Sequence, residues 1–106
     1  MTVKKRFIGK TNVEVSELGF GTAPLGGWPV EVSDKNAQSS LQKAWDLGIR
    51  YFDTAPLYGS GMSEIRLGNF LKNQNRNEFT ISTKVGRLIV DTTKSKASEK
   101  FIGSPI

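Results

Sequence analysis

The sequence predicts an α/β fold in which short parallel strands alternate with helices. Three short, mainly apolar runs, at residues 18–22, 49–52 and 79–83, are typical of buried strands. Two amphipathic stretches, beginning near residues 33 and 63, separate them. Strands and helices that alternate in this order form βαβ units, whose ligands and catalytic groups gather in the loops at the carboxyl ends of the strands.

A β-hairpin is expected before these units. Residues 4–8 and 13–15 flank a Gly-Lys-Thr-Asn segment at residues 9–12, and its glycine and asparagine favour a tight reversal. The hairpin precedes the first parallel strand.

The first parallel strand, at residues 18–22, leads into a Gly- and Pro-rich turn at residues 23–29. Gly19 and Gly21 begin a G-x-G-x-x-G spacing, but the sixth position is Pro24 and no helix is expected to start there. The sequence therefore excludes the Rossmann dinucleotide fingerprint. Close backbone packing is one interpretation of the two glycines.

The first helix is predicted to start after Ser33 as its N-cap and to end at Gly48 in the C′ position. Its apolar residues recur at helical spacing and predict a buried face: Ala37, Leu41, Ala44 and Trp45. We assign Trp45 a packing role and no ligand.

The second helix is predicted to be capped by Ser63 and to bury Leu67, Phe70 and Leu71. Gly68 in its middle costs about 1 kcal/mol relative to alanine. We therefore expect this glycine to let the helix lie close to the sheet.

The carboxyl-terminal part, residues 88–106, is predicted to be a mobile loop or tail. Residues 88–90 are compatible with a short strand, whereas residues 91–100 are polar and low in apolar content.

Composition limits the possible functions. The 106 residues include no cysteine and no histidine, which excludes a disulfide framework and any metal site built on those ligands. The net charge of +5 arises mainly at the two ends, without the aromatic interleaving or recognition helix of a nucleic-acid-binding protein. No run approaches the roughly 18 apolar residues of a membrane span. We expect a soluble, cytoplasmic chain with no metal, nucleic-acid or membrane partner.

Three polar side chains follow successive strands: Asp53, Tyr58 and Lys84. Taken singly, each has an ordinary structural interpretation, as a turn former, a half-buried aromatic residue and a solvated charge. Because the carboxyl ends of parallel strands converge, we expect the three to meet on one face. An ammonium within hydrogen-bonding reach favours the ionised form of a phenol, and a carboxylate beyond it keeps the ammonium charged. Tyr58 is therefore a candidate general acid or base.

Three spaced motifs in this chain resemble the signature regions of the aldo-keto reductases. They read L-G-F-G-T-A-P-L-G-G, D-T-A-P-L-Y-G and S-T-K-V-G-R, and the match covers residues 7–87. In detail they are similar to the branch that contains D-threo-aldose, L-galactose and pyridoxal 4-dehydrogenases. The resemblance implies a (β/α)8 barrel. Since such a barrel needs about 250 residues, the chain is expected to hold its amino-terminal part, incomplete, with the bottom hairpin and about three β/α units. Residues 1–106 would then form a partial reductase domain.

The resemblance also implies catalytic roles. Tyr58 would be the proton donor or acceptor, Lys84 its activating neighbour, and Asp53 the carboxylate that holds the ammonium. The family uses in addition a histidine from the end of the following strand, which would lie beyond this chain.

The cofactor implied by the resemblance is NADP or NAD, with most of its binding site outside this chain. Gly21, Thr22 and Asp53 would lie at its nicotinamide end. Trp28 and Tyr58 would face the substrate, although a hydrophobic plug is an equal interpretation of Trp28.

The leading hypothesis is therefore the amino-terminal portion of an NAD(P)-dependent aldo-keto reductase. It would transfer hydride between nicotinamide and the carbonyl or hemiacetal carbon of a small molecule, and be inactive as an isolated fragment because its outer strands lack partners. Two alternatives are a truncated, non-catalytic interaction or regulatory module and an unrelated open α/β ligand-binding domain. The joint presence of Asp53, Tyr58 and Lys84 argues against both.

Overall fold

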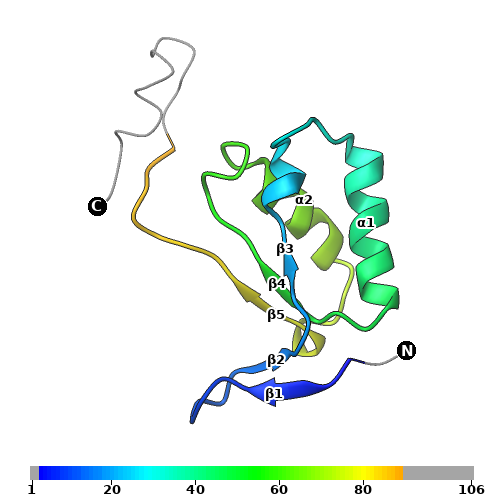
Figure 1. Cartoon of the computed structure of the whole chain (residues 1–106), viewed down its shortest axis with the longest axis vertical. Coiled ribbons are helices and arrows are strands. Elements are labelled where there is room, and N and C mark those ends of the chain that lie inside the picture. Colours follow the sequence, from blue (N-terminus) through cyan, green and yellow to red (C-terminus); the bar gives the residue numbers. More distant parts are fainter. Residues whose placement is uncertain (1–2, 90–106) are drawn as a thin grey trace.

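The structure is a computed structural model that describes residues 3–89, and it has the predicted α/β architecture (Figure 1). Two helices lie together on one side of a small parallel sheet, and a hairpin lies beyond one end of that sheet. The hairpin strands are β1 (Lys5–Phe7) and β2 (Glu14–Ser16), the parallel strands are β3 (Phe20–Gly21), β4 (Tyr51–Asp53) and β5 (Thr80–Ser82), and the helices are α1 (Asp34–Asp46) and α2 (Met62–Leu71).

The predicted hairpin is confirmed. Strands β1 and β2 pair antiparallel with Arg6 opposite Val15. The turn is closed by the backbone bond from Ile8 N to Val13 O, at 2.9 Å, and by Thr11, whose hydroxyl donates to Ile8 O at 2.6 Å. This hairpin lies below the amino ends of the parallel strands in Figure 1.

The parallel sheet has the order β3-β4-β5, with Gly21 opposite Asp53 and Asp53 opposite Ser82. Its strands are shorter than predicted, but the pairing continues past their ends: Thr22 N donates to Asp53 O and Thr54 N donates to Ser82 O, each at 2.9 Å. The carboxyl ends of the three strands are thereby held side by side.

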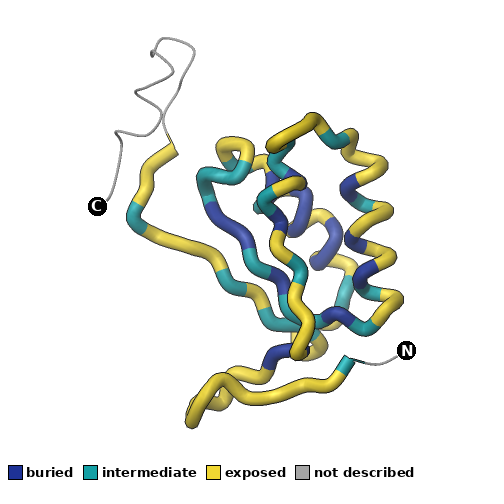
Figure 2. The backbone as a smooth tube through the Cα atoms, in the orientation of Figure 1, coloured by how far each residue is buried: buried dark blue, intermediate teal, exposed yellow. Residues whose placement is uncertain are grey.

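The hydrophobic core lies between the parallel sheet and the two helices (Figure 2). Phe52 on β4 is fully buried and stacks at 6.3 Å on Trp45 of α1. The predicted apolar faces of both helices are confirmed, with Trp45 partly rather than fully buried. The side chain of Phe52 therefore ties the central strand to the helix layer.

The start of α1 follows the prediction and the start of α2 does not. The Ser33 side chain accepts a bond from Asn36 N at 3.1 Å, as an N-cap should. In α2 the N-cap is Gly61, with a φ of 99°, so the expectation that Ser63 caps this helix was wrong. The hydroxyl of Ser63 is buried and donates instead to Thr22 O at 2.7 Å. The serine anchors α2 to the end of β3.

Three further expectations need correction. Gly68 is exposed and no atom lies within 4 Å of the position of a Cβ, so it does not allow close packing on the sheet. The turn at residues 23–29 contains a short 3-10 helix, η1 (Ala23–Gly26), which Pro24 is suited to start. Leu88 and Ile89 are not in a strand, and residues 90–106 lie outside the described part.

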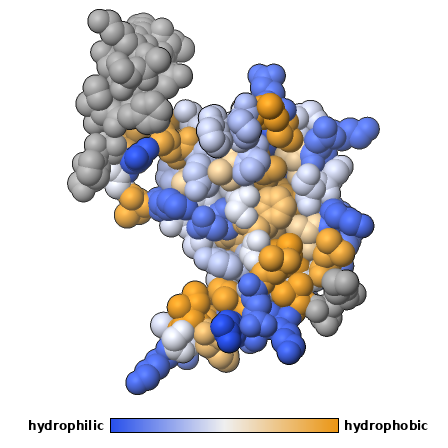
Figure 3. Space-filling model, in the orientation of Figure 1, coloured by the Kyte–Doolittle hydropathy of each residue, from blue (hydrophilic) through white to orange (hydrophobic). Residues whose placement is uncertain are grey.

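Within residues 3–89 the sheet does not close into a barrel, because β3 and β5 are its two edge strands. A second 3-10 turn, η2 (Arg76–Glu78), leads into β5. Apolar patches interrupt the polar surface in Figure 3, and several lie towards the hairpin, where Phe7, Ile8 and Val13 are exposed. No helix among the described residues has the length and apolar character needed to cross a membrane.

Candidate active site

The three side chains singled out from the sequence converge at the carboxyl end of the sheet. Asp53 ends β4, and Lys84 follows β5 by two residues. The Lys84 ammonium donates to Asp53 Oδ2 at 2.9 Å and to Thr54 O at 3.0 Å. It also lies over the Tyr58 ring, 5.2 Å from the ring centroid, which is within cation–π range. Asp53 is the main cause of the raised pKa of Lys84, and the Tyr58 hydroxyl contributes to it through a hydrogen-bonding interaction, so the ammonium is close to both the ring and the hydroxyl of Tyr58.

Both charged members of this cluster are held in their ionised forms. The Ser82 hydroxyl, and then the Lys84 ammonium, lower the pKa of Asp53 by hydrogen bonding to its carboxylate. The same Asp53 carboxylate raises the pKa of Lys84. At neutral pH the site therefore holds a carboxylate and an ammonium.

Two residues of the cluster were not singled out from the sequence. Ser82 donates to Asp53 Oδ1 at 2.6 Å, and the Tyr51 hydroxyl lies 3.1 Å from Ser82 Oγ. Strand alternation could have indicated both, because side chains two residues apart on a strand share a face. Tyr51 precedes Asp53 by two residues, and Ser82 precedes Lys84 by two.

The loop that carries Tyr58 is held against η1 by a contact between two glycines. A Cβ on Gly26 would lie 2.6 Å from Gly59 N and from the carbonyl carbon of Tyr58. Gly59 has a φ of 65°, which favours glycine there as well. The backbone of Tyr58 is therefore fixed by a close approach that only a residue without a side chain permits.

The predicted cofactor-binding residues occupy two different environments. Gly21 is exposed beside Asp53, and no atom lies within 4 Å of the position of a Cβ. Thr22 is fully buried, and its hydroxyl donates to Asp53 O at 3.0 Å. Gly21 thus leaves open space at the face of the site, whereas the Thr22 side chain joins β3 to β4. Trp28, predicted on the substrate side, is 76% exposed in the turn after η1.

A cavity of about 270 Å³ adjoins the cluster, with Leu57, Tyr58, Lys84, Val85 and Arg87 among its lining residues. It opens beside the phenol and the ammonium, where a small molecule would reach both. Residues 3–89 contain no group of three His, Cys, Asp or Glu side chains that could hold a metal ion.

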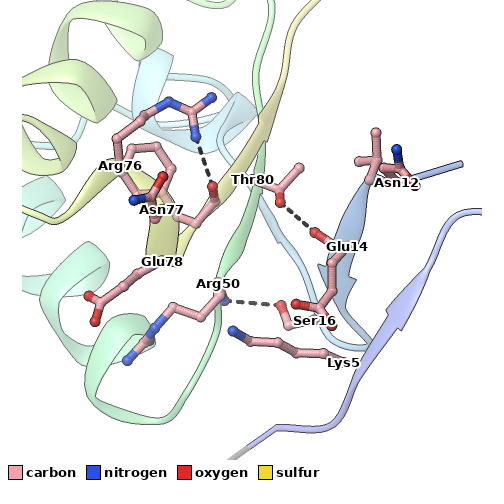
Figure 4. A pocket seen from close by; sticks show the side chains of 11 residues that line it. Lys5, Asn12, Glu14, Ser16, Arg50, Arg76, Asn77, Glu78 and Thr80 are labelled. Atoms are coloured by element: carbon pink, nitrogen blue, oxygen red, sulfur yellow. Dashed lines mark hydrogen bonds between the residues drawn. The ribbon is translucent and has the colours of Figure 1, made fainter.

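A second cavity, of about 350 Å³, lies at the opposite end of the sheet, between the hairpin and β5 (Figure 4). The two arginines that line this cavity both donate hydrogen bonds to backbone carbonyls. Arg50 donates to Trp45 O at 2.7 Å, and Arg76 donates to Phe79 O at 2.9 Å. The hydroxyls of Ser16 and Thr80 join the hairpin to β4 and β5. This cavity therefore lies at the contact between the hairpin and the parallel sheet.

The fold and the site together define a class of protein: parallel βα units with a carboxylate, an ammonium and a phenol at the carboxyl ends of their strands, as in the active face of a (β/α)8 barrel. The comparison with known proteins identifies the family. Residues 17–104 match the model of the Aldo/keto reductase family, and the chain belongs to this family of oxidoreductases. Members of this family generally use a nicotinamide cofactor, NAD or NADP.

Known relatives agree with this assignment. The chain is 49% identical over 88 residues to pyridoxal 4-dehydrogenase from Microbacterium luteolum, a match that covers 83% of this chain and 25% of the relative. It is 52% identical over 75 residues to D-threo-aldose 1-dehydrogenase from a Pseudomonas species, covering 71% and 23%. An aldo-keto reductase from Bacillus halodurans, solved in its holo form, superimposes with a TM-score of 0.73 at 36% identity and covers 90% and 29%. The chain thus spans about a quarter of the length of the curated relatives it matches, and the fold is the amino-terminal part of their (β/α)8 barrel.

Proposed function

We propose that this chain supplies the proton-transfer site of an NAD(P)-dependent aldo-keto reductase of the aldose-dehydrogenase type. Hydride would pass between nicotinamide and the carbonyl or hemiacetal carbon of a small aldehyde, ketone or sugar. The observation that carries the proposal is the position of the Lys84 ammonium, bonded to Asp53 and lying over the ring of Tyr58. The names of the two curated relatives, which specify pyridoxal and D-threo-aldose, support this substrate class.

The proton-transfer group in this proposal is the Tyr58 hydroxyl. It gives its proton to the carbonyl oxygen during reduction and takes a proton from the hydroxyl during oxidation. The Lys84 ammonium stabilises the negative charge that develops on the phenol oxygen when the proton leaves. Asp53 and the Thr54 carbonyl hold that ammonium in place. The lysine thus acts on the phenol, and the aspartate acts on the lysine.

We infer that the cofactor binds at the open side of the cluster. Gly21 has free space where a side chain would otherwise stand, directly beside Asp53. We infer that Gly21, Thr22 and Asp53 line the nicotinamide end, Thr22 by shaping the backbone, and that Trp28 flanks the substrate. A bound nicotinamide supplies or accepts the hydride.

The proposal is tested in the complete polypeptide as its gene encodes it. Oxidation of D-threo-aldoses and of pyridoxal is followed by the formation of NADH or NADPH. Replacing Tyr58 with Phe is expected to lower kcat by about 10²- to 10⁴-fold, because it removes the acid–base group. Lys84→Met is expected to lower kcat strongly, whereas Lys72→Met, which removes an exposed lysine after α2, serves as the matched control. Wild-type turnover by the Tyr58→Phe variant would refute the assignment.

We also propose that residues 1–106 in isolation are inactive. The chain spans about a quarter of the length of its curated relatives, so most of a dinucleotide site would lie outside it, and hydride transfer depends on the positioning of the dinucleotide. Titration of NADPH into the isolated chain, followed by its fluorescence, should give no saturable binding in the micromolar range. Saturable binding in that range would contradict this part of the proposal.

A further inference from the structure

The Asp53 carboxylate is bonded at both of its oxygens, to two residues at the carboxyl end of β5. Oδ2 accepts from Lys84 and Oδ1 accepts from the Ser82 hydroxyl at 2.6 Å. A separation of 2.5–2.7 Å is typical of a hydroxyl that donates to an ionised carboxylate, one of the stronger classes of protein hydrogen bond. Asp53 is therefore clamped between β5 and the loop that follows β5.

The direction of the next bond follows from the number of protons. Ser82 has one hydroxyl proton, and that proton is directed to Asp53. The Tyr51 hydroxyl, 3.1 Å from Ser82 Oγ, must then be the donor in the bond between these two groups. Tyr51 thus donates a hydrogen bond to Ser82, and Ser82 donates one to Asp53.

The backbone holds these side chains on one face of the sheet. Tyr51 and Asp53 are two residues apart on β4, and Ser82 is opposite Asp53 on β5. Gly19 makes room for the Tyr51 ring, because a Cβ there would lie 3.0 Å from Tyr51 Cδ2. The chain of hydroxyls is thus built on paired strands rather than on a loop.

The exposure of the ion pair explains why a second anchor matters. The side chains of Lys84 and Asp53 are 50% and 40% exposed. An ion pair so open to water contributes only about 0–1 kcal/mol and does not by itself fix a geometry. The Ser82 bond restrains the carboxylate independently of the lysine.

We propose that Tyr51 and Ser82 are positioning residues that hold the Asp53 carboxylate, and through it the Lys84 ammonium, in the place from which Lys84 acts on Tyr58. This inference rests on the proposed function, which assigns Tyr58 the proton transfer. The hydrogen bonds of Tyr51 and Ser82 described above lead to Asp53 and not to Tyr58. Their effect reaches it through the carboxylate and the ammonium.

The test uses the complete polypeptide and two measurements. The first is turnover, with kcat and KM determined separately. The second is the pKa of Asp53, from the pH dependence of its ¹³C carboxyl resonance, which is assigned by its loss in Asp53→Asn. Ser82→Ala is the main variant, and Ser82→Thr restores a hydroxyl on a residue that suits strands. Ser40→Ala, at an exposed position of α1, is the matched control.

Ser82→Ala is expected to lower kcat by about ten- to a hundredfold with little change in KM, as small displacements at a reacting centre do. It should also raise the pKa of Asp53, because the carboxylate loses the hydrogen bond that lowers its pKa most. Ser82→Thr should behave as wild type. Tyr51→Phe, which keeps the ring in place, should change both quantities in the same direction and by less. If Ser82→Ala does not fold, the Tyr51→Phe variant tests the positioning role.

Failure of this inference is distinguishable from failure of the proposed function. A fully active Tyr58→Phe variant would overturn the proposed function and, with it, the effect on catalysis that we propose for Tyr51 and Ser82. The Asp53 resonance reports on the hydrogen bonds whether or not the protein turns over substrate. If Ser82→Ala and Tyr51→Phe leave that titration and kcat at the values of Ser40→Ala, the positioning role is refuted.

Discussion

The contact between Gly26 and the loop of Tyr58 makes a quantitative prediction for Gly26→Ala. The new Cβ would lie 2.6 Å from Gly59 N and from the Tyr58 carbonyl carbon, about 0.8 Å short of the 3.4 Å at which ordinary contact begins. Both neighbours are backbone atoms, which cannot turn aside as a flexible side chain would. We therefore expect η1 and the Tyr58 loop to separate by most of an ångström, which moves the phenol relative to Lys84.

A displacement of about 1 Å at a reacting centre costs up to about a hundredfold in rate, and overpacking costs about 1–3 kcal/mol of stability. In the complete polypeptide, Gly26→Ala should therefore lower kcat by one to two orders of magnitude and lower the free energy of unfolding measured with urea. Gly68→Ala is the matched control, since its Cβ would meet no atom within 4 Å and alanine favours a helix by about 1 kcal/mol over glycine. If Gly26→Ala matched Gly68→Ala in turnover and in urea midpoint, the argument from close approach would be wrong.

Three further predictions concern the core, the helix contact and pH. Phe52→Ala should lower the free energy of unfolding by about 3–5 kcal/mol in urea titrations, since its fully buried ring would leave a cavity. Arg66→Met should cost about 1–3 kcal/mol by the same assay, because Leu25 O loses its donor at 2.7 Å; Asp34→Asn should cost less, because the Asp34 side chain is 88% exposed. The pKa of the Asp53 carboxyl is lowered in the folded protein. Its contribution to the stability of the fold is therefore present above the ordinary pKa of 3.8 and is lost as the pH falls through the lower pKa of the folded state. The stability difference between wild type and Asp53→Asn should shrink over that acid range, and a difference that did not change with pH would contradict this.

The sequence was sufficient for those parts of the fold that depend on local patterns. Helical periodicity located both helices, and the Ser33 cap and the hairpin turn depend on residues close together in the chain. Ser63 shows where this reasoning fails. A serine at the start of a helix is a good cap, but here its hydroxyl bonds a carbonyl 41 residues away, and Gly61 takes the capping position through its left-handed backbone.

The candidate site divides in the same way. Asp53, Tyr58 and Lys84 could be brought together from the sequence because parallel strands share their carboxyl ends. Strand alternation could have placed Ser82 and Tyr51 on the face of the site, but their bonding partners could not be assigned, because those bonds depend on which residues are opposite each other in the sheet. The prediction that Gly68 allows α2 to lie close to the sheet was wrong for a related reason. Helical periodicity indicated which side of α2 meets the sheet, but it did not give the exposure of each position on the helix.

Strand β4 has only three residues, yet it permits only one alignment with its neighbours. Phe52 points into the core beneath the helices, while Tyr51 and Asp53 on either side of it point to the opposite face. Slippage by one residue would exchange these faces, placing a carboxylate among aromatic rings and a phenyl ring beside Ser82 and Lys84. Burial of an unpaired carboxylate is so unfavourable that the slipped arrangement cannot compete. A chain in which β4 is paired correctly therefore already has the Asp53 carboxylate on the face of the site.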